Sequence, residues 1–420
     1  MNKTRQRKLD RVKGNVLVLG VDVARTQHAA ALRLPGGEFA KSFCFKNDLE
    51  GFQKLAKESQ ECCDKHKLRG TVLAIEPTGV YGEALAYWWE DHGGTVVWVN
   101  PMHTKRVKEL DDNSPLKSDP KDAKVIADLA SQGKYLECHL PRGIFSELRN
   151  LVAQRDRYQS HRTAVISQLH QCIDRLFPEL IREFSSVRVK SYRKLLASYP
   201  APKELASVSP EDLTNLLRKW SRGSLGEEKA HRLIYVASKS VGVNEGASII
   251  AADVKSLIEQ IESIEIYCDT VEKQIKKCLE RTPGAALLMT IPSFGPVTVA
   301  GILANTGDLT EYQHPEELLK FAGLNLFDIS SGTHHGRHRI TKRGRAHLRK
   351  ILYMAALRSA RRDSPFRKYY QQLVERGVNR TAALVALMRK LLKVCWSLIR
   401  NNRGFEVERL KPTTTQKQAA

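Results

Sequence analysis

The chain has no stretch of 18 uncharged apolar residues, and its first 14 residues, MNKTRQRKLDRVKG, contain no apolar segment typical of a signal peptide. These absences argue against a transmembrane helix and a secretory leader, so we expect a cytoplasmic protein without a membrane partner. Its eight cysteines include no CxxC pair. This spacing favours reduced thiols over disulfides or a zinc site.

Acidic residues are scarce relative to basic ones, with 46 Asp and Glu against 68 Lys and Arg and a formal net charge of +22. Such a surplus makes an acidic polymer the leading class of partner. Between Gly332 and Lys350 no acidic residue occurs beside seven basic ones: Arg337, Arg339, Lys342, Arg343, Arg345, Arg349 and Lys350. This run indicates contact with a phosphate backbone, and its alternative interpretation is a solvated basic loop.

The first third of the chain alternates between apolar strand patterns and helical patterns. Strands are predicted at 15–24, 28–34, 38–46, 71–75 and 95–100, and helices at 49–66, 80–92, 103–111 and 119–132. Two hairpin-linked strands after the first strand, followed by alternating helix and strand, predict a ribonuclease-H-like α/β domain over residues 15–140. Residues 1–14 are predicted to form a mobile basic arm.

Four acidic residues of this domain are candidate metal ligands. Asp22 closes the first predicted strand and Glu76 the fourth, and open α/β sheets place their chemistry at that edge. Asp119 and Asp122 lie on one face of the first turn of a predicted helix, where they would also complement the helix dipole. Four carboxylates converging on one sheet edge would form a hard-oxygen site for Mg²⁺ or Mn²⁺.

The rest of the chain is predicted to be mostly helical. Residues 141–283 form a helical coiled-coil spacer, in which the patterns at 146–180 and 254–279 pair antiparallel or between subunits, with a helical insert at 181–250. Residues 284–402 form a mostly α C-terminal domain, and residues 403–420 a disordered tail. The turn from Pro292 to Pro296 predicts a helix-hairpin-helix whose backbone at Gly295 holds a DNA phosphate, or an ordinary helical corner.

With these segments in order, the chain resembles bacterial insertion-sequence transposases that join a RuvC-like DEDD domain to a C-terminal domain with a nucleophilic serine. Pilin-gene invertases belong to the same group, and some of its members are guided by a bridge RNA. The resemblance spans nearly the whole chain. It is carried by the motifs GVDVA, AIEPTGVYG, KSDPKDAKVIADL, IPSFGPVTVAGILANTGD, FAGLNLFDISSG, ITKRGRAHLRKIL and ALMRKLL.

The resemblance implies the roles of particular residues. The DEDD acids fall on Asp22, Glu76, Asp119 and Asp122, which would hold Mg²⁺ or Mn²⁺, and the nucleophilic serine falls on Ser331, with Ser330 the second choice. The chain departs from the family pattern at Ser293, which replaces the first Gly of the usual hairpin. The implied partner is DNA. The predicted coiled-coil seam separately indicates a second copy of the chain, as a dimer or tetramer. A guide RNA is left open.

The resulting hypothesis is a DNA transposase that cuts and rejoins DNA through a phosphoserine intermediate at a composite site of metal ions and Ser331. One rival is a metal-dependent, junction-resolving nuclease in which the four acids and water act without the serine. A second rival is a non-catalytic nucleic-acid-binding protein in which the basic C-terminal half does all the work.

Overall fold

The computed structural model describes residues 3–77, 79–111, 119–327, 339–361 and 363–410; within them, the side chains of residues 3–5, 108–111 and 119–120 are not described. The chain divides into two compact units, Met1–Leu140 and Pro141–Ala420.

Unit 1 is built on a six-stranded mixed sheet with the order β3-β2-β1-β4-β5-β6. β1 (Val16–Asp22), β2 (Gln27–Arg33) and β3 (Phe39–Lys46) are joined antiparallel, whereas β4 (Gly70–Ile75) and β5 (Thr95–Trp98) continue parallel to β1. The two-residue strand β6 (Leu136–Glu137) adds an antiparallel edge. The mixed sheet resembles the ribonuclease-H-like fold, as the sequence predicted, although β6 was not foreseen.

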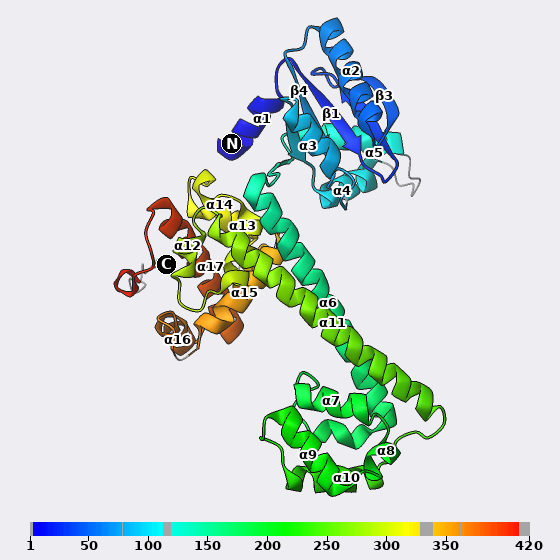
Figure 1. The fold of residues 1–420 in the computed structure, drawn as a ribbon. Helices are drawn as coiled ribbons and strands as arrows, with labels where there is room; N and C mark the ends of the chain where they lie inside the picture. Colours follow the sequence, from blue (N-terminus) through cyan, green and yellow to red (C-terminus); the bar gives the residue numbers. More distant parts are fainter. Residues whose placement is uncertain (1–2, 78, 112–118, 328–338, 362, 411–420) are drawn as a thin grey trace, which may run out of the picture. The chain divides into compact units, whose positions relative to one another are not determined.

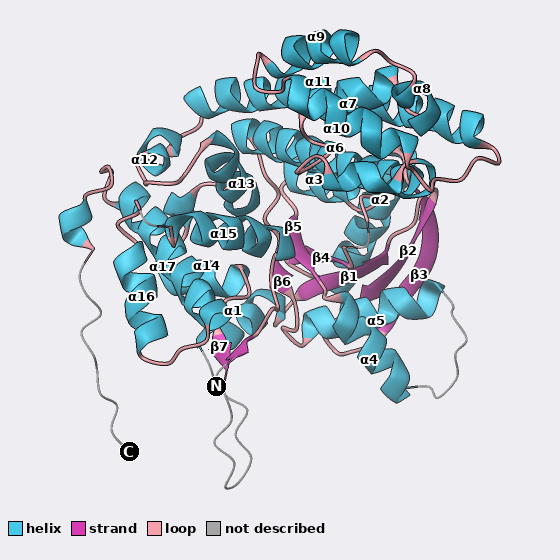
Figure 2. Ribbon diagram, turned by 90° about the horizontal axis from the view of Figure 1, so that it is seen from below, coloured by secondary structure: helices cyan, strands magenta, loops and turns pink. Residues whose placement is uncertain are grey.

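Helices cover both faces of the sheet (Figure 2). α2 (Leu49–His66) and α3 (Glu83–Asp91) bury one apolar face against Leu19 and Ile75 of the strands. α5 (Asp119–Ser131) covers the opposite face, where it packs on Val18 and Val72, and α4 (Pro101–Asp111) lies against α5. The alternation of these apolar residues between the two faces is the period of two that a strand imposes on its side chains.

The N-terminal segment is a helix, α1 (Lys3–Val12), so the prediction of a mobile arm is wrong for its described part. Val12 is buried against the α5 side of the sheet. The Tyr135 hydroxyl donates to the carbonyl of Lys8 at 2.9 Å, and the Arg11 guanidinium pairs with Glu137. These contacts order a segment whose charge alone suggested exposure to water.

Unit 2 begins with a pair of long antiparallel helices, α6 (Gly143–Leu176) and α11 (Ala247–Glu280), which lie side by side in Figure 1. Their direction follows from three contacts: Arg281 with Glu147 at 2.8 Å, Arg155 with Glu272 at 2.7 Å, and Cys172 with Asp253 at 3.4 Å. The two patterns predicted from the sequence therefore pair within one chain. Their description as a coiled coil stays a prediction.

Each end of this pair carries its own apolar core. One core receives the helical insert, which consists of η1 (Pro178–Arg182), α7 (Lys190–Ser198), α8 (Pro202–Ala206), α9 (Pro210–Ser221) and α10 (Glu227–Ser238). The other receives the C-terminal helices, which are α12 (Ala285–Met289), α13 (Pro296–Thr306), α14 (Pro315–Phe321), α15 (Ala346–Ser359), α16 (Arg367–Glu375) and α17 (Arg380–Arg400), with the short η2 (Leu309–Glu311).

The C-terminal core also holds part of the segment that was predicted to be a disordered tail. Phe405 packs on the core with its ring centroid 5.3 Å from that of Phe366, and its backbone N–H donates to Thr290 Oγ1 at 2.8 Å. A short helix, η3 (Val407–Arg409), follows. The prediction is therefore wrong for residues 403–410, and residues 411–420 lie outside the described residues.

Two further features of the described residues concern the cysteines and the character of the helices. All eight cysteines are free thiols, and burial raises the pKa of the Cys395 thiol to about 12. None of the helices in the described ranges combines the length and apolar character that crossing a bilayer requires.

Candidate active site

The first two candidate acids are neighbours at one edge of the unit 1 sheet. β1 and β4 run parallel with Val21 opposite Ile75, so Asp22 and Glu76 follow at adjacent positions on the two strands. Val21 and Ile75 face the α2 and α3 side, and alternation turns the next residue of each strand toward α5. Both acidic residues are half-buried. The sequence therefore placed Asp22 and Glu76 correctly at the carboxyl edge of the sheet.

The first turn of α5 reaches the same edge because this helix runs against the direction of β1. Val18, early in β1, packs with Ala130, near the end of α5. A Cβ at Gly20 would lie 2.1 Å from the carbonyl oxygen of Ala123. Ala29, which pairs with Asp22 across β1 and β2, packs against Ala123. The helix thus runs antiparallel to β1. One more turn toward the start of α5 brings Asp122 and Asp119, the first residue of the helix, to the end of β1.

The second pair of acids belongs to the first turn of α5. Asp122 is half-buried, and the side chain of Asp119 lies outside the described atoms. Among the side chains that the structure does describe, no three acidic, histidine or cysteine groups come together as a ready metal cluster. Carboxylate oxygens of this kind nevertheless fit a hard divalent cation by their chemistry.

A threonine that sequence reasoning missed orients one of the acids. Thr104, on α4, is 2% exposed, and its Oγ1 donates to Glu76 Oε2 at 2.6 Å. The same hydroxyl lies 2.8 Å from the carbonyl oxygen of Pro101. No local pattern in the sequence marks this residue, because its role depends on how α4 packs beside the end of β4.

In unit 2 the candidate serine belongs to the connection between two short strands. β7 (Leu326–Phe327) pairs antiparallel with β8 (Arg339–Ile340), and the intervening residues 328–338 lie outside the described residues. Ser330, Ser331 and the predicted phosphate contact Arg337 are among them, as are His334, His335 and His338. The structure therefore reports the base of this hairpin and not the position of the serine.

The base of the hairpin is closely packed. The backbone N–H of Thr341 donates to the backbone carbonyl of Asn325 at 2.9 Å. The backbone N–H of Lys342 donates to the backbone carbonyl of Gly323 at 3.0 Å. A Cβ at Gly344 would lie 2.4 Å from the backbone nitrogen of Gly323, so only glycine allows this approach. Both ends of the 328–338 segment are thus anchored in folded backbone.

The described members of the predicted phosphate-contact set fall into two groups. The side chains of Arg339, Lys342, Arg343 and Lys350 are exposed and suit contact with an external anion. Arg345 and Arg349 are engaged internally: the Arg345 guanidinium lies 5.1 Å above the Phe321 ring, and Arg349 Nη1 donates to the carbonyls of Ala322 and Gly344 at 3.0 and 2.9 Å. These two arginines hold the hairpin base.

The polar partners of His347, near the start of α15, were also missed from the sequence. His347 Nε2, on α15, pairs with Asp156 Oδ2 of α6, while His347 Nδ1 lies 3.0 Å from Asn305 Nδ2 of α13. The hydrogen bond to His347 lowers the pKa of the Asp156 carboxyl, and the charges of Lys350 and Arg155 act in the same direction. These contacts tie α6, α13 and α15 together near the start of α15.

The predicted helix-hairpin-helix turn has one unusual backbone conformation. Ser293 has a φ of +75°, a region that favours glycine, which is the residue that the resemblance leads us to expect here. Gly295 is the N-cap of α13, with open space where a Cβ would be. Phosphate binding at Gly295 stays a prediction.

Two family models match the chain. One, described as a transposase with a DEDD domain of the IS110 type, covers residues 19–178, and the other, described as transposase IS116/IS110/IS902 family, covers residues 285–371. The first match includes all four candidate acids, and the second includes the candidate serine.

Curated relatives match along nearly their whole length. The chain is 26% identical to a 44.8 kDa protein of insertion element IS116 from Streptomyces clavuligerus, covering 92% of this chain and 95% of the relative. It is 25% identical to a pilin gene-inverting protein from Moraxella bovis, covering 92% and 97%. It is 22% identical to the transposase of element IS1111A from Coxiella burnetii, covering 94% and 92%.

Among solved structures, RuvC of Thermus thermophilus matches with 15% identity and a TM-score of 0.21, covering 29% of this chain and 99% of that one. So low a score adds nothing to what the sheet order already shows. The family identification depends instead on the two family matches and on relatives that span both units. This chain belongs to the IS116/IS110/IS902 family of transposases.

Proposed function

We propose that this transposase cuts and rejoins DNA at a composite site made from the acids of unit 1 and Ser331 of unit 2. The observation that supports it most is the convergence of Asp22, Glu76 and the first turn of α5 on one sheet edge, within a family of DNA-rearranging enzymes. DNA is the proposed substrate, since the relatives are transposases and a gene-inverting protein.

Asp22, Glu76, Asp119 and Asp122 are the proposed ligands of Mg²⁺ or Mn²⁺. A bound divalent cation would offset the negative charge that develops on a phosphodiester under attack. The protein's contribution is to fix the ligands: the register of β1 and β4 sets Asp22 beside Glu76, and Thr104 fixes the orientation of the Glu76 carboxylate.

Ser331 is the proposed nucleophile. Its Oγ would form a bond to phosphorus while one P–O bond of the DNA strand breaks, and the departing deoxyribose oxygen would take up a proton. The reverse reaction would rejoin a strand and release the serine without ATP, because the phosphoserine bond retains the energy of the diester. Ser331 would meet the acids within one chain or from a second copy in a dimer or tetramer.

Two substitutions test this proposal. Ser331→Ala should abolish covalent protein–DNA adducts, detected on denaturing gels with labelled DNA, while leaving DNA binding close to that of the unsubstituted protein. Asp119→Asn should remove strand cleavage even with added Mg²⁺. Adducts that persist in Ser331→Ala would move the nucleophile elsewhere, with Ser330→Ala as the next variant to examine.

The same assay separates the proposal from a junction-resolving nuclease. A nuclease that used water would give hydrolysed ends and no protein-linked DNA, and Ser331→Ala would cut at the rate of the unsubstituted protein. If acid substitutions left DNA rearrangement unchanged, the non-catalytic interpretation would replace both.

A further inference from the structure

The apolar contact between α6 and α11 is interrupted midway by polar side chains. On one side of the interruption the pair buries Leu148 and Val152, and on the other it buries Val165 and Leu169. Between them, Gln159 Nε2 lies 3.5 Å from Cys268 Sγ, and the next layer holds charged groups. Burying a polar group between two helices costs free energy unless the group has a hydrogen-bond or ion-pair partner. Each polar group in this layer is therefore expected to have such a partner.

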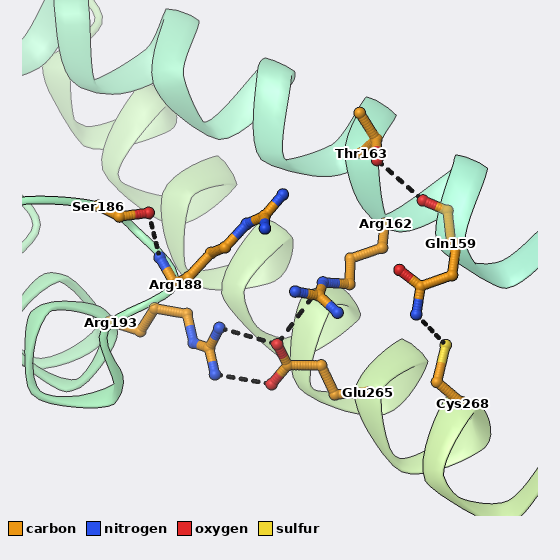
Figure 3. A network of polar contacts seen from close by, with 8 residues as sticks. All are labelled: Gln159, Arg162, Thr163, Ser186, Arg188, Arg193, Glu265 and Cys268. Atoms are coloured by element: carbon orange, nitrogen blue, oxygen red, sulfur yellow. Dashed lines mark hydrogen bonds and ion pairs between the residues drawn. The ribbon is translucent and has the colours of Figure 1, made fainter. Parts of the chain in front are cut away.

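Glu265 of α11 is the centre of the charged layer (Figure 3). Arg193 of α7, which is 2% exposed, donates to it through two nitrogens, Nη1 to Oε1 at 3.1 Å and Nη2 to Oε2 at 2.7 Å. Arg162 of α6 approaches the same carboxylate less closely, with its Nε 3.7 Å from Oε1. Arg193 gives each oxygen of Glu265 a donor, and the single negative charge of Glu265 cannot neutralise both Arg193 and Arg162.

A third guanidinium lies in the same region. Arg188, in the loop before α7, is exposed, and its backbone N–H donates to Ser186 Oγ at 3.2 Å. Figure 3 shows its side chain extending from this loop toward the helices of the α6–α11 pair. Within the described part of the chain, no carboxylate forms an ion pair with Arg188. Three guanidinium groups and one carboxylate leave the cluster with two uncompensated positive charges.

We propose that Arg162 and Arg188, supported by the Arg193–Glu265 pair, form a binding site for a phosphodiester group of a nucleic-acid backbone. Guanidinium groups present planar pairs of N–H donors that match phosphate oxygens, and neighbouring guanidiniums repel each other unless an anion lies between them. A purely structural role needs only the Arg193–Glu265 pair, and one carboxylate cannot balance the added charges of Arg162 and Arg188. The exposure of Arg188 opens the cluster to a large ligand.

This site would extend nucleic-acid contact from the basic C-terminal segment to the helical spacer, which no motif of the sequence assigned to binding. It is independent of the cleavage chemistry, because none of its residues belongs to the proposed acid or serine set. Duplex DNA and single-stranded RNA both present phosphodiester groups. The slope of log affinity against log salt differs between duplexes and single strands, so binding measured with each probe tells the two ligands apart.

The decisive variant is Arg188→Gln in the full chain, since an exposed side chain can be replaced without disturbing the core. Binding of labelled duplex DNA and of labelled single-stranded RNA is measured by fluorescence anisotropy over a salt series. Loss of one phosphate contact should lower the slope of log affinity against log salt by about 0.9 for the duplex or about 0.7 for the single strand, and weaken binding about threefold to tenfold. The probe that shows the change identifies the ligand.

Arg218→Gln is the matched control, because Arg218 is an exposed arginine on α9 of the same insert. It should leave the slope for both probes near that of the unsubstituted protein. If Arg188→Gln and Arg218→Gln behave alike on both probes, the site is refuted, whatever the cleavage assays of Ser331 and Asp119 show.

A second variant predicts a change of opposite sign. Glu265→Gln removes the one carboxylate of the cluster, so it should tighten binding of the same probe and steepen its salt dependence by a similar amount. If the cluster only supports the fold and binds no nucleic acid, Glu265→Gln would lose thermal stability without any gain in affinity for either probe. That result would count against the proposal. Should Glu265→Gln fail to fold, the Arg188→Gln comparison still decides.

Discussion

At the scale of single residues, the acids of unit 1 depend on neighbours that do no chemistry themselves. The buried Thr104 hydroxyl donates to Glu76 at 2.6 Å, which restricts how the carboxylate can turn. Residues that hydrogen-bond a metal ligand fix its direction, and losing one commonly costs about 10- to 100-fold in metal affinity or activity. Thr104 is therefore expected to influence the proposed cation site without touching the DNA.

Thr104→Val tests this expectation, because valine keeps the shape of threonine and removes its hydroxyl. The Mg²⁺ concentration needed for half-maximal strand cleavage should rise about tenfold, with DNA affinity in the absence of metal unchanged. Thr104→Ser, which retains the hydroxyl, is the control and should stay within about threefold of the unsubstituted protein. Equal Mg²⁺ requirements in the Val and Ser variants would show that the hydrogen bond does not position Glu76 for metal binding.

The residues that the sequence located and those that it missed differ in how local their signal is. Asp22 and Glu76 end apolar strands, and adjacent strand ends share a sheet edge, so a local pattern was enough to bring them together. Thr104 and the Asp156–His347 pair meet only through tertiary packing of helices. No spacing rule connects such residues before the helices are placed.

At the scale of elements, the long helices were predictable, whereas their pairing and the shortest elements were not. The stripe along α6 is interrupted at Arg155 and Arg162, and the structure shows that these arginines face Glu272 and Glu265 of α11. The sequence displays both sets of charges but leaves open whether they meet within one chain or between two. β6 is only two residues long, and α1 is ordered by its contacts with Tyr135 and Glu137, so both depend on their surroundings.

The contact between β1 and α5 is the element-scale feature on which the acid site most depends. Gly20→Ala would place a methyl group 2.1 Å from the Ala123 carbonyl oxygen and 2.5 Å from the Ala127 nitrogen. Since these atoms are backbone, α5 itself has to move, and overpacking of this kind costs about 1–3 kcal/mol. We expect a lower urea midpoint, together with a loss of strand cleavage that exceeds the loss of folded protein, because Asp119 and Asp122 move with the helix.

Gly70→Ala provides the control for Gly20→Ala. Gly70 lies at the start of β4 in the same sheet, and a Cβ there would have no atom within 4 Å. Its urea midpoint and its cleavage rate should remain near those of the unsubstituted protein. If Gly20→Ala behaved like Gly70→Ala, the close approach of α5 to β1 would not be what holds the acids in place.

At the scale of the whole molecule, charge and chemistry are divided between the two units. Residues 1–140, with the four acids, contain 22 Lys and Arg against 19 Asp and Glu, whereas residues 141–420 contain 46 against 27. Nearly all of the surplus positive charge therefore belongs to the unit with the long helices and the basic hairpin. A near-neutral unit that carries the acids and a strongly basic unit suit separate tasks, with the first proposed to cut and the second proposed to hold the nucleic acid.

This division predicts that unit 1 folds alone and that α1 is part of it. The sheet and the apolar clusters on its two faces draw only on residues up to 140. Compared with a fragment of residues 1–140, a fragment of residues 15–140 should have a free energy of unfolding lower by about 2–3 kcal/mol. Burial of Val12 contributes about 1.5–2 kcal/mol of this difference and the Tyr135–Lys8 hydrogen bond about 1 kcal/mol.

Urea denaturation followed by circular dichroism measures this difference. Val12→Ala within the 1–140 fragment should reproduce roughly half of it, because the helix stays while most of its buried side chain is lost. Arg7→Ala changes an exposed residue of the same helix and should leave the unfolding midpoint almost unchanged. Equal midpoints for residues 1–140 and 15–140 would mean that α1 adds nothing to the fold and that the first 14 residues act as the free basic arm their charge suggests.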